Sequence, residues 1–321
     1  MKKLAKSAVC FLICISCLAI PVLGRELVAV GQVIGLELRD GTVTVAAFDE
    51  ELGGAAQKAG LEVGDQILRI NGKNVACAED VRRFLGTSKG SVELEVRREG
   101  KSLRLTVSPE ITADGPKLGL YLRQGVTGVG TVTWYDPETG EFATLGHGVS
   151  NSAGQLLKMT AGNAFRTRVA AVRKGKSGEP GQLMGCAESR TPIGELSANT
   201  ERGVFGTSDV AWQGKTVETA RWEDVKTGKA TIISTVSGNS VQEYSVEILK
   251  IYPKATASGR NLLIKVTDPD LLAVTGGIVQ GMSGSPIIQD GKLVGAVTHV
   301  LVNDPTTGYG IFIENMLDAA A

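Results

Sequence analysis

The stretch from Ala56 to Gly72 constrains the fold of this chain more than any other part of its sequence. It has the pattern A-x-x-A-G-L-x-x-G-D-x-I-L-x-I-N-G. The alanines favour a short helix, the glycines permit tight turns, Ile67 to Ile70 reads as a strand, and Asn71-Gly72 is a preferred hairpin turn. This fixed order of helix, turn, strand and hairpin predicts a small α+β domain.

Short strand patterns and one helical pattern extend this domain over residues 26–108, which resemble a PDZ domain. The resemblance implies that an extended peptide adds a strand to a sheet edge and that a hydrophobic pocket reads its terminal side chain. The carboxylate-binding loop would fall on residues 32–36, where Gly35 allows close backbone approach and Ile34 and Leu36 line the pocket. Residues 79–85 would form the other wall. The ligand could be a partner's C-terminus or the chain's own tail, and packing of the domain on its neighbour stays open.

A stretch punctuated by proline and glycine, residues 108–116, marks the boundary to a second domain at 117–321. This domain contains many short strand patterns and few helical ones. The 41 glycines of the chain fit numerous tight turns between short strands. We therefore expect a mainly β protein, in which the second domain is an all-β barrel or sandwich of about a dozen strands.

The first 24 residues have the features of a targeting segment and say little about the fold. Three lysines precede an uninterrupted apolar or small stretch, Ser7 to Gly24, as in an export signal. Val22 and Gly24 would suit signal peptidase, but about 17 or 18 apolar residues can also just span a bilayer. We expect an exported protein, and residues 1–24 are either a cleaved signal peptide or a retained anchor.

The composition argues against nucleic acid, a metal or a cofactor. Lys plus Arg and Asp plus Glu both number 34, so no net charge favours an anionic polymer. Outside the N-terminal segment only Cys77 and Cys186 remain, and one isolated pair is neither a disulfide framework nor a metal-ligand spacing. No His-Glu-x-x-His sequence of a metalloprotease is present.

The sequence Gly281-Met282-Ser283-Gly284-Ser285-Pro286 points to acyl-transfer chemistry. Small residues around a serine let the backbone bend so that Oγ and nearby amides face one point. The stretch resembles the nucleophile loop of chymotrypsin-like proteases. That likeness implies Ser283 as nucleophile and the amides of Gly281 and Ser283 as the oxyanion hole, while Ser285 remains a rival nucleophile.

A serine nucleophile needs a base, and the chain has only two histidines, His147 and His299. His147 follows a strand pattern and lies between two glycines that expose its ring, so we favour it. His299 lies within an apolar alternation, which is typical of a supporting residue in a strand. Asp268 and Asp270 follow a further strand, and either could orient the histidine or simply form the turn around Pro269.

These segments together resemble the SpoIVB-type (stage IV sporulation protein B) serine peptidases, which have trypsin-like chemistry. The resemblance covers nearly the whole chain and is carried above all by residues 277–288, 295–300 and 302–310. It implies catalytic Ser283 and His147, with Asp268 rather than Asp270 as the orienting acid. An acid so close before the serine departs from the chymotrypsin order, in which the acid lies between the two halves of the enzyme.

The resemblance also implies an exported endopeptidase of sporulation signalling. Such an enzyme crosses the forespore membrane and acts, anchored or secreted, between forespore and mother cell. It cleaves a membrane-bound regulatory protein, and itself, so that a mother-cell sigma factor is activated. The alternative is an inert PDZ-bearing scaffold of the cell envelope; the presence of Ser283, His147 and Asp268 together argues against it.

Overall fold

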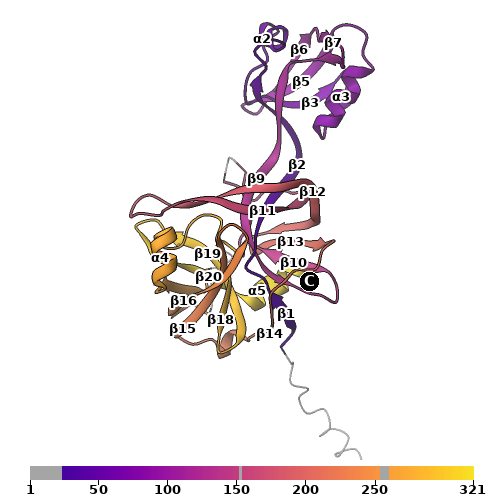
Figure 1. The fold of residues 1–321 in the computed structure, drawn as a ribbon. Coiled ribbons are helices and arrows are strands. Elements are labelled where there is room, and N and C mark those ends of the chain that lie inside the picture. The colour runs from indigo at the N-terminus through magenta and orange to yellow at the C-terminus, as the bar shows by residue number, and fades with distance from the viewer. Residues whose placement is uncertain (1–23, 152–153, 254–259) are drawn as a thin grey trace, which may run out of the picture.

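The computed structural model describes residues 24–151, 154–253 and 260–321. A small α+β domain forms one end of the molecule and two β-barrels form the other (Figure 1). The expected signal or anchor segment lies outside the described residues, apart from Gly24. In the described ranges, no helix is both long and apolar enough to cross a membrane. The protein is mainly β, which confirms the predicted fold class.

The small domain is the part of the chain that resembles a PDZ domain, and we call it the PDZ unit. Its sheet contains the second half of β2, β3, β5, β6 and the start of β9. The predicted hairpin is present, with φ of 48° at Asn71 and 75° at Gly72. Helix α3 buries Val81 and Leu85 against the domain core. The elements are β2 (Val33–Phe48), α2 (Gly54–Lys58), β3 (Gln66–Ile70), β4 (Lys73–Asn74), α3 (Ala78–Gly86), β5 (Val92–Arg98), β6 (Lys101–Val107), β7 (Glu110–Thr112), β8 (Gly115–Lys117) and β9 (Leu120–Tyr135).

The first barrel closes because each of six strands pairs with the next around a ring. The first half of β2 and the second half of β9 belong to this ring. Its core contains Ile34, Leu36, Leu38, Val132 and Phe142. The ring order is β2, β9, β10 (Glu141–Thr144), β13 (Gly203–Ser208), β12 (Gln182–Thr200) and β11 (Ala161–Arg173).

The second barrel is also closed and six-stranded. Buried aliphatic side chains fill its interior, among them Ile232, Ile264 and Val297. Its ring order is β15 (Gly228–Ser237), β16 (Ser240–Ile251), β17 (Leu262–Val266), β20 (Asp304–Phe312), β19 (Lys292–Leu301) and β18 (Pro286–Gln289). The helices of this half are η1 (Trp222–Asp224), α4 (Pro269–Thr275) and α5 (Ile313–Ala320).

An apolar interface joins the two barrels. Leu27 of β1 (Glu26–Ala29) and Trp134 of β9 belong to one buried cluster with Leu293 of β19 and Ile311 of β20, and all four are fully buried. Strand β14 (Lys215–Glu218) pairs with β1 beside this cluster. Burial of apolar surface is the main stabilising force between such elements, so the barrels are held in a defined relative position.

The structure divides the chain differently from the expected domains at 26–108 and 117–321. Strand β1 pairs with β14 and β9, and Val33–Leu38 pairs with β9 and β11, so both segments belong to the barrel half of the molecule. The PDZ unit is therefore inserted between two parts of the first barrel. Apolar alternation reveals which face of a strand is buried but not which strand is its partner.

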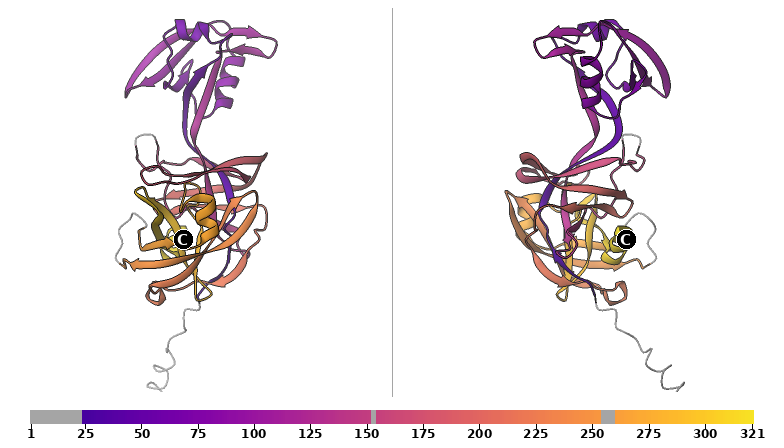
Figure 2. Two further views of the ribbon diagram at one scale, coloured as in Figure 1. Left: turned by 60° about the vertical axis from the view of Figure 1, so that its left-hand side comes forward. Right: turned by 90° about the vertical axis from the view of Figure 1, so that its right-hand side faces the viewer.

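Strands β2 and β9 form a two-stranded connection between the PDZ unit and the first barrel (Figure 2). Gly41 has φ of 74° and lies where the pairing register shifts between Leu38 and Val43. Opposite, a side chain at Gly125 would come within 1.8 Å of the Leu38 carbonyl oxygen. The two glycines therefore make a bulge that bends a continuous ribbon.

Candidate active site

Ser283 lies on a glycine-rich loop that connects α4 with strand β18 of the second barrel. Gly281 and Gly284 flank it with φ of 100° and 95°. A Cβ atom at Gly284 would lie only 2.0 Å from the Thr131 carbonyl oxygen, so only glycine fits there. The Ser283 hydroxyl is partly exposed and donates a hydrogen bond to the Thr298 carbonyl at 2.8 Å.

The backbone amides around Ser283 differ in their hydrogen bonding. The N–H groups of Gln280, Met282, Gly284 and Ser285 all donate to backbone carbonyls. Within the described ranges, neither the Gly281 nor the Ser283 N–H has an acceptor. Two available amides beside a serine hydroxyl are what stabilisation of an oxyanion requires.

His147 follows strand β10 of the first barrel, after a sharp backbone reversal. Leu145 has φ of 70°, which is rare for a non-glycine residue, and Gly146 has φ of 67°. The His147 Nδ1 atom lies 2.9 Å from the Gly148 carbonyl oxygen. A carbonyl can only accept, so Nδ1 carries the proton and Nε2 is left as the basic atom. Burial lowers the pKa of His147, and the hydrogen bond with Gly148 partly opposes that effect.

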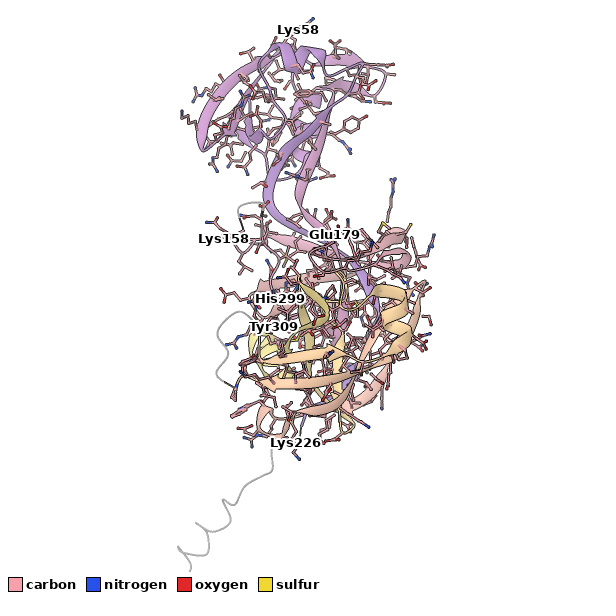
Figure 3. The ribbon with its side chains drawn as sticks, turned by 90° about the vertical axis from the view of Figure 1, so that its left-hand side faces the viewer. Lys58, Lys158, Glu179, Lys226, His299 and Tyr309 are labelled. Atoms are coloured by element: carbon pink, nitrogen blue, oxygen red, sulfur yellow. The ribbon has the colours of Figure 1, made fainter. Side chains whose placement is uncertain are left out.

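Ser283 and His147 line one cavity of about 500 Å³ between the two barrels, which we call the inter-barrel cavity. Its other walls come from β2, β9, β19 and the segment before Ser283, and include Leu36, Val129, Ile278 and His299. Figure 3 labels His299 on the second barrel, near Tyr309. The structure thus brings the sequence-predicted serine and histidine to one site from opposite barrels.

Asp268 is in a different environment. Its carboxylate accepts hydrogen bonds from the backbone amides of Ser245, Asp270 and Leu271 at 3.0 to 3.1 Å and so caps the N-terminus of α4. It does not line the inter-barrel cavity. In the part of the chain that the structure describes, no carboxylate forms a hydrogen bond or ion pair with His147. The expected role of Asp268 as orienting acid is therefore not supported by the geometry, and Asp268 is a helix cap.

Comparisons with known proteins show the family of the chain. The family described as SpoIVB peptidase S55 matches residues 115–317, well over half of the chain. The chain belongs to this family. A PDZ domain model matches residues 50–98, inside the inserted unit. The chain thus combines a domain of the S55 peptidase family with a PDZ domain.

Other similar proteins share only parts of the chain. A protein named as a zinc metalloprotease from Rhizobium meliloti is 31% identical over 39% of this chain and 31% of its own length. A DegP-like periplasmic serine endoprotease of Pseudomonas savastanoi is 35% identical over 26% of this chain and 18% of its own. The chain thus spans about a third or less of the length of these curated relatives.

Among solved structures, the inactive form of the Rv3671c protease is 14% identical, with a TM-score of 0.34 over 60% of this chain and 82% of that one. A serine-to-alanine mutant of the same protein from M. tuberculosis is 13% identical, with a TM-score of 0.34 over 60% of this chain and 79% of that one.

The rival residues Ser285 and His299 lie in two different environments. Ser285 is fully buried and its hydroxyl donates to Ser234 at 3.0 Å inside the second barrel, so substrate cannot reach it. His299 lines the inter-barrel cavity, but its Nδ1 is buried with no hydrogen-bond partner among the described residues. Burial, together with the nearby His147 and Arg260, lowers the pKa of His299 to about 4.

The predicted peptide-binding residues of the PDZ domain lie elsewhere. Ile34, Gly35 and Leu36 are in the first barrel, where Gly35 and Leu36 pair with Phe165 and Ala164 of β11. Ile34 and Leu36 are buried in the barrel core, and Leu36 also lines the inter-barrel cavity. The prediction that these three form the carboxylate-binding loop is wrong, because β2 continues into the barrel.

A groove of about 870 Å³ does exist in the PDZ unit, between α3 and residues 114–122. Gly119 has φ of 63°. Among the described residues, the start of β9 that follows it pairs with β2 alone, so its other edge has no partner strand there. A free strand edge beside a helix is the arrangement that accepts a peptide as an added strand. The sequence Leu118-Gly119-Leu120 carries this signal, although it falls inside the domain expected at 117–321.

Asn199 supports the backbone near His147 from outside the inter-barrel cavity, and no sequence motif marks it. Its side chain accepts from the Val149 N–H at 2.8 Å and donates to the carbonyls of Val149 and Leu157 at 2.8 and 2.9 Å. These bonds fix the loop that follows His147. Asn199 lies in β12, much of which is exposed, so no apolar alternation marks this strand in the sequence.

Proposed function

We propose that the protein cleaves peptide bonds with Ser283 as nucleophile, His147 as general base, and the Gly281 and Ser283 amides as the oxyanion hole. The observation that carries this proposal is the inter-barrel cavity, which Ser283 and His147 line from opposite barrels. The two amides without acceptors and the basic Nε2 atom of His147 support it.

In this mechanism the Ser283 hydroxyl rotates away from the Thr298 carbonyl and gives its proton to Nε2 of His147. Oγ then attacks the substrate carbonyl carbon, and the resulting oxyanion is held by the two amides. His147 returns the proton to the leaving amine, which leaves an acyl-enzyme, and water hydrolyses this ester by the same route in reverse.

The Gly148 carbonyl takes the part that a carboxylate has in a Ser-His-Asp triad. It accepts from Nδ1 and thereby fixes the tautomer of His147. Because a carbonyl is neutral, it stabilises the imidazolium less than a carboxylate would. A lowered pKa of His147 fits this environment and keeps the ring unprotonated, ready to act as a base, at neutral pH.

We further propose that the substrate is a membrane-associated regulatory protein of sporulation, and that the enzyme also cleaves itself. Membership of the SpoIVB peptidase S55 family supports this, as does the apolar stretch Ser7 to Gly24, typical of an exported protein. The enzyme would act between forespore and mother cell, anchored or secreted, and its activity would lead to activation of a mother-cell sigma factor.

The test is self-processing of residues 25–321 together with cleavage of the extracytoplasmic part of a candidate membrane-bound regulator. Wild type should trim itself and cut the regulator, as followed by intact mass, and Ser283→Ala should do neither. A wild-type protein that binds the regulator without cleaving it would favour the inert scaffold instead.

A further inference from the structure

Thr131 of strand β9 makes hydrogen bonds to both catalytic segments. It is fully buried where the two barrels meet. Its N–H donates to the Ser283 carbonyl at 2.9 Å, and its Oγ1 donates to the Gly281 carbonyl at 2.8 Å. Its own carbonyl accepts from Thr144 Oγ1 at 2.6 Å and from the Leu145 N–H at 3.4 Å. The backbone and side chain of one residue therefore tie the serine loop to the strand that leads to His147.

The bonds to the serine loop fix the two peptide planes on either side of the Met282–Ser283 peptide. The Gly281 carbonyl belongs to the plane before it, and the Ser283 carbonyl belongs to the plane after it. Because each peptide unit is rigid and planar, this leaves the Ser283 N–H little freedom to turn. Thr131 thus controls the direction of an amide proposed for the oxyanion hole without touching substrate.

The bonds on the other side fix the start of the backbone reversal before His147. Leu145 holds a φ of 70°, a conformation that persists only where the surroundings enforce it. The Thr131 carbonyl helps to hold this conformation because it accepts hydrogen bonds from Thr144 Oγ1 and from the Leu145 N–H.

We propose that Thr131 is a positioning residue that sets the separation and orientation of Ser283 and His147 across the barrel junction. This rests on the proposed function, in which these two residues carry the catalysis. The Thr131 hydroxyl orients the peptide that contains the Gly281 carbonyl. It is therefore required for the rate of the chemical step and not for substrate binding. A displacement of about 1 Å at a catalytic group can cost on the order of 100-fold in rate.

Thr131→Val tests this, because valine keeps the shape and the backbone bonds but removes the hydroxyl. We expect kcat on a peptide substrate to fall by about 100-fold with KM nearly unchanged, and Thr131→Ser to restore most of the activity. Labelling of Ser283 by a fluorophosphonate should slow in parallel. Thr235→Val is the matched control, since it removes another fully buried hydroxyl that bonds across the barrels, to the Gly31 carbonyl at 3.0 Å.

The outcomes separate the claims. The inference is overturned if Thr131→Val keeps the wild-type kcat, or if Thr131→Val and Thr131→Ser lose kcat equally. It is also overturned if kcat falls only together with Tm and Thr235→Val shows the same fall in both. If Thr131→Val does not fold, Thr144→Val removes the bond on the histidine side and should also lower kcat; unchanged kcat there would overturn the inference too. Absence of labelling in the wild type would instead contradict the proposed function, and the inference with it.

Discussion

The imidazole rings of His147 and His299 lie 5.0 Å apart, centroid to centroid, and belong to opposite barrels. They are the only histidines of the chain. Both rings are largely removed from water, which lowers the pKa of each, and the charge of one ring would further disfavour the charge of the other. The pair is therefore neutral at neutral pH. Within the described part of the chain, His147 is the one of the two whose Nδ1 has a hydrogen bond to a carbonyl.

Removal of each histidine should have a different effect. His147→Ala should reduce kcat by at least 100-fold, because general-base catalysis contributes on that order. His299→Ala should leave measurable turnover, since its ring lines the cavity without a fixed tautomer. Steady-state kinetics of both variants on one peptide substrate, compared by kcat, shows which histidine is the base. The reverse order of effects would make His299 the base.

The stability of the fold should depend on His299 in acid. Its pKa is about 4 in the folded protein and 6.5 in the unfolded chain, so between these values the unfolded chain binds more protons. Stability is therefore lost as pH falls from about 6.5 to about 4, and is fully present above that window. Denaturant unfolding at a series of pH values should show a shallower loss for His299→Gln. An equal slope for both proteins would contradict the burial of this ring.

Asp268 should matter for folding rather than catalysis. Asp268→Ala removes the cap of α4 and should lower the free energy of unfolding by about 1 to 2 kcal/mol. Asp268→Asn keeps a capping oxygen and should retain both stability and kcat. Thermal unfolding and peptide hydrolysis measured on the same samples test this. A large loss of kcat in Asp268→Asn at unchanged Tm would restore the acid role that the sequence suggested.

The PDZ groove and the first barrel should respond to different substitutions. Leu120→Lys places a charge at the apolar groove and should weaken binding of peptides with apolar C-termini, while hydrolysis of a short substrate continues. Gly35→Val should reduce hydrolysis and leave peptide binding unchanged. Its Cβ atom would lie 2.8 Å from Thr167 Oγ1 and so disturb the first barrel. Fluorescence polarisation and hydrolysis are the two measurements. Loss of peptide binding in Gly35→Val alone would favour the originally predicted loop.

The inter-barrel cavity should select uncharged side chains near the cleaved bond. Among the described residues that line it, none is an aspartate, glutamate, lysine or arginine. A charged side chain buried there would lose its hydration without gaining a partner. Mass spectrometry of a digested peptide library should show cleavage beside apolar residues. Preferred cleavage beside lysine, arginine or acidic residues would contradict this.

The sequence indicated two residues that the structure brings to one cavity, but it did not indicate the architecture around them. Ser283 and His147 could be recognised because each has glycines close to it in the sequence. Most of these glycines occupy left-handed backbone conformations in the turns around the two residues, and a local pattern can reveal such turns. Ile34 to Leu36 could not be placed, because one strand, β2, serves both the PDZ unit and the barrel. Asp268 was misleading because an aspartate before a proline reads equally well as a helix cap and as a catalytic acid.

The most direct test of the account is fluorophosphonate labelling of purified residues 25–321, compared among wild type, Ser283→Ala and Ser285→Ala. Ser283 lies in the inter-barrel cavity, and Ser285 is sealed inside the second barrel. We expect wild type and Ser285→Ala to be labelled and Ser283→Ala to remain unlabelled, with the adduct mapped to Ser283. Labelling that persists in Ser283→Ala would contradict the assignment of the nucleophile.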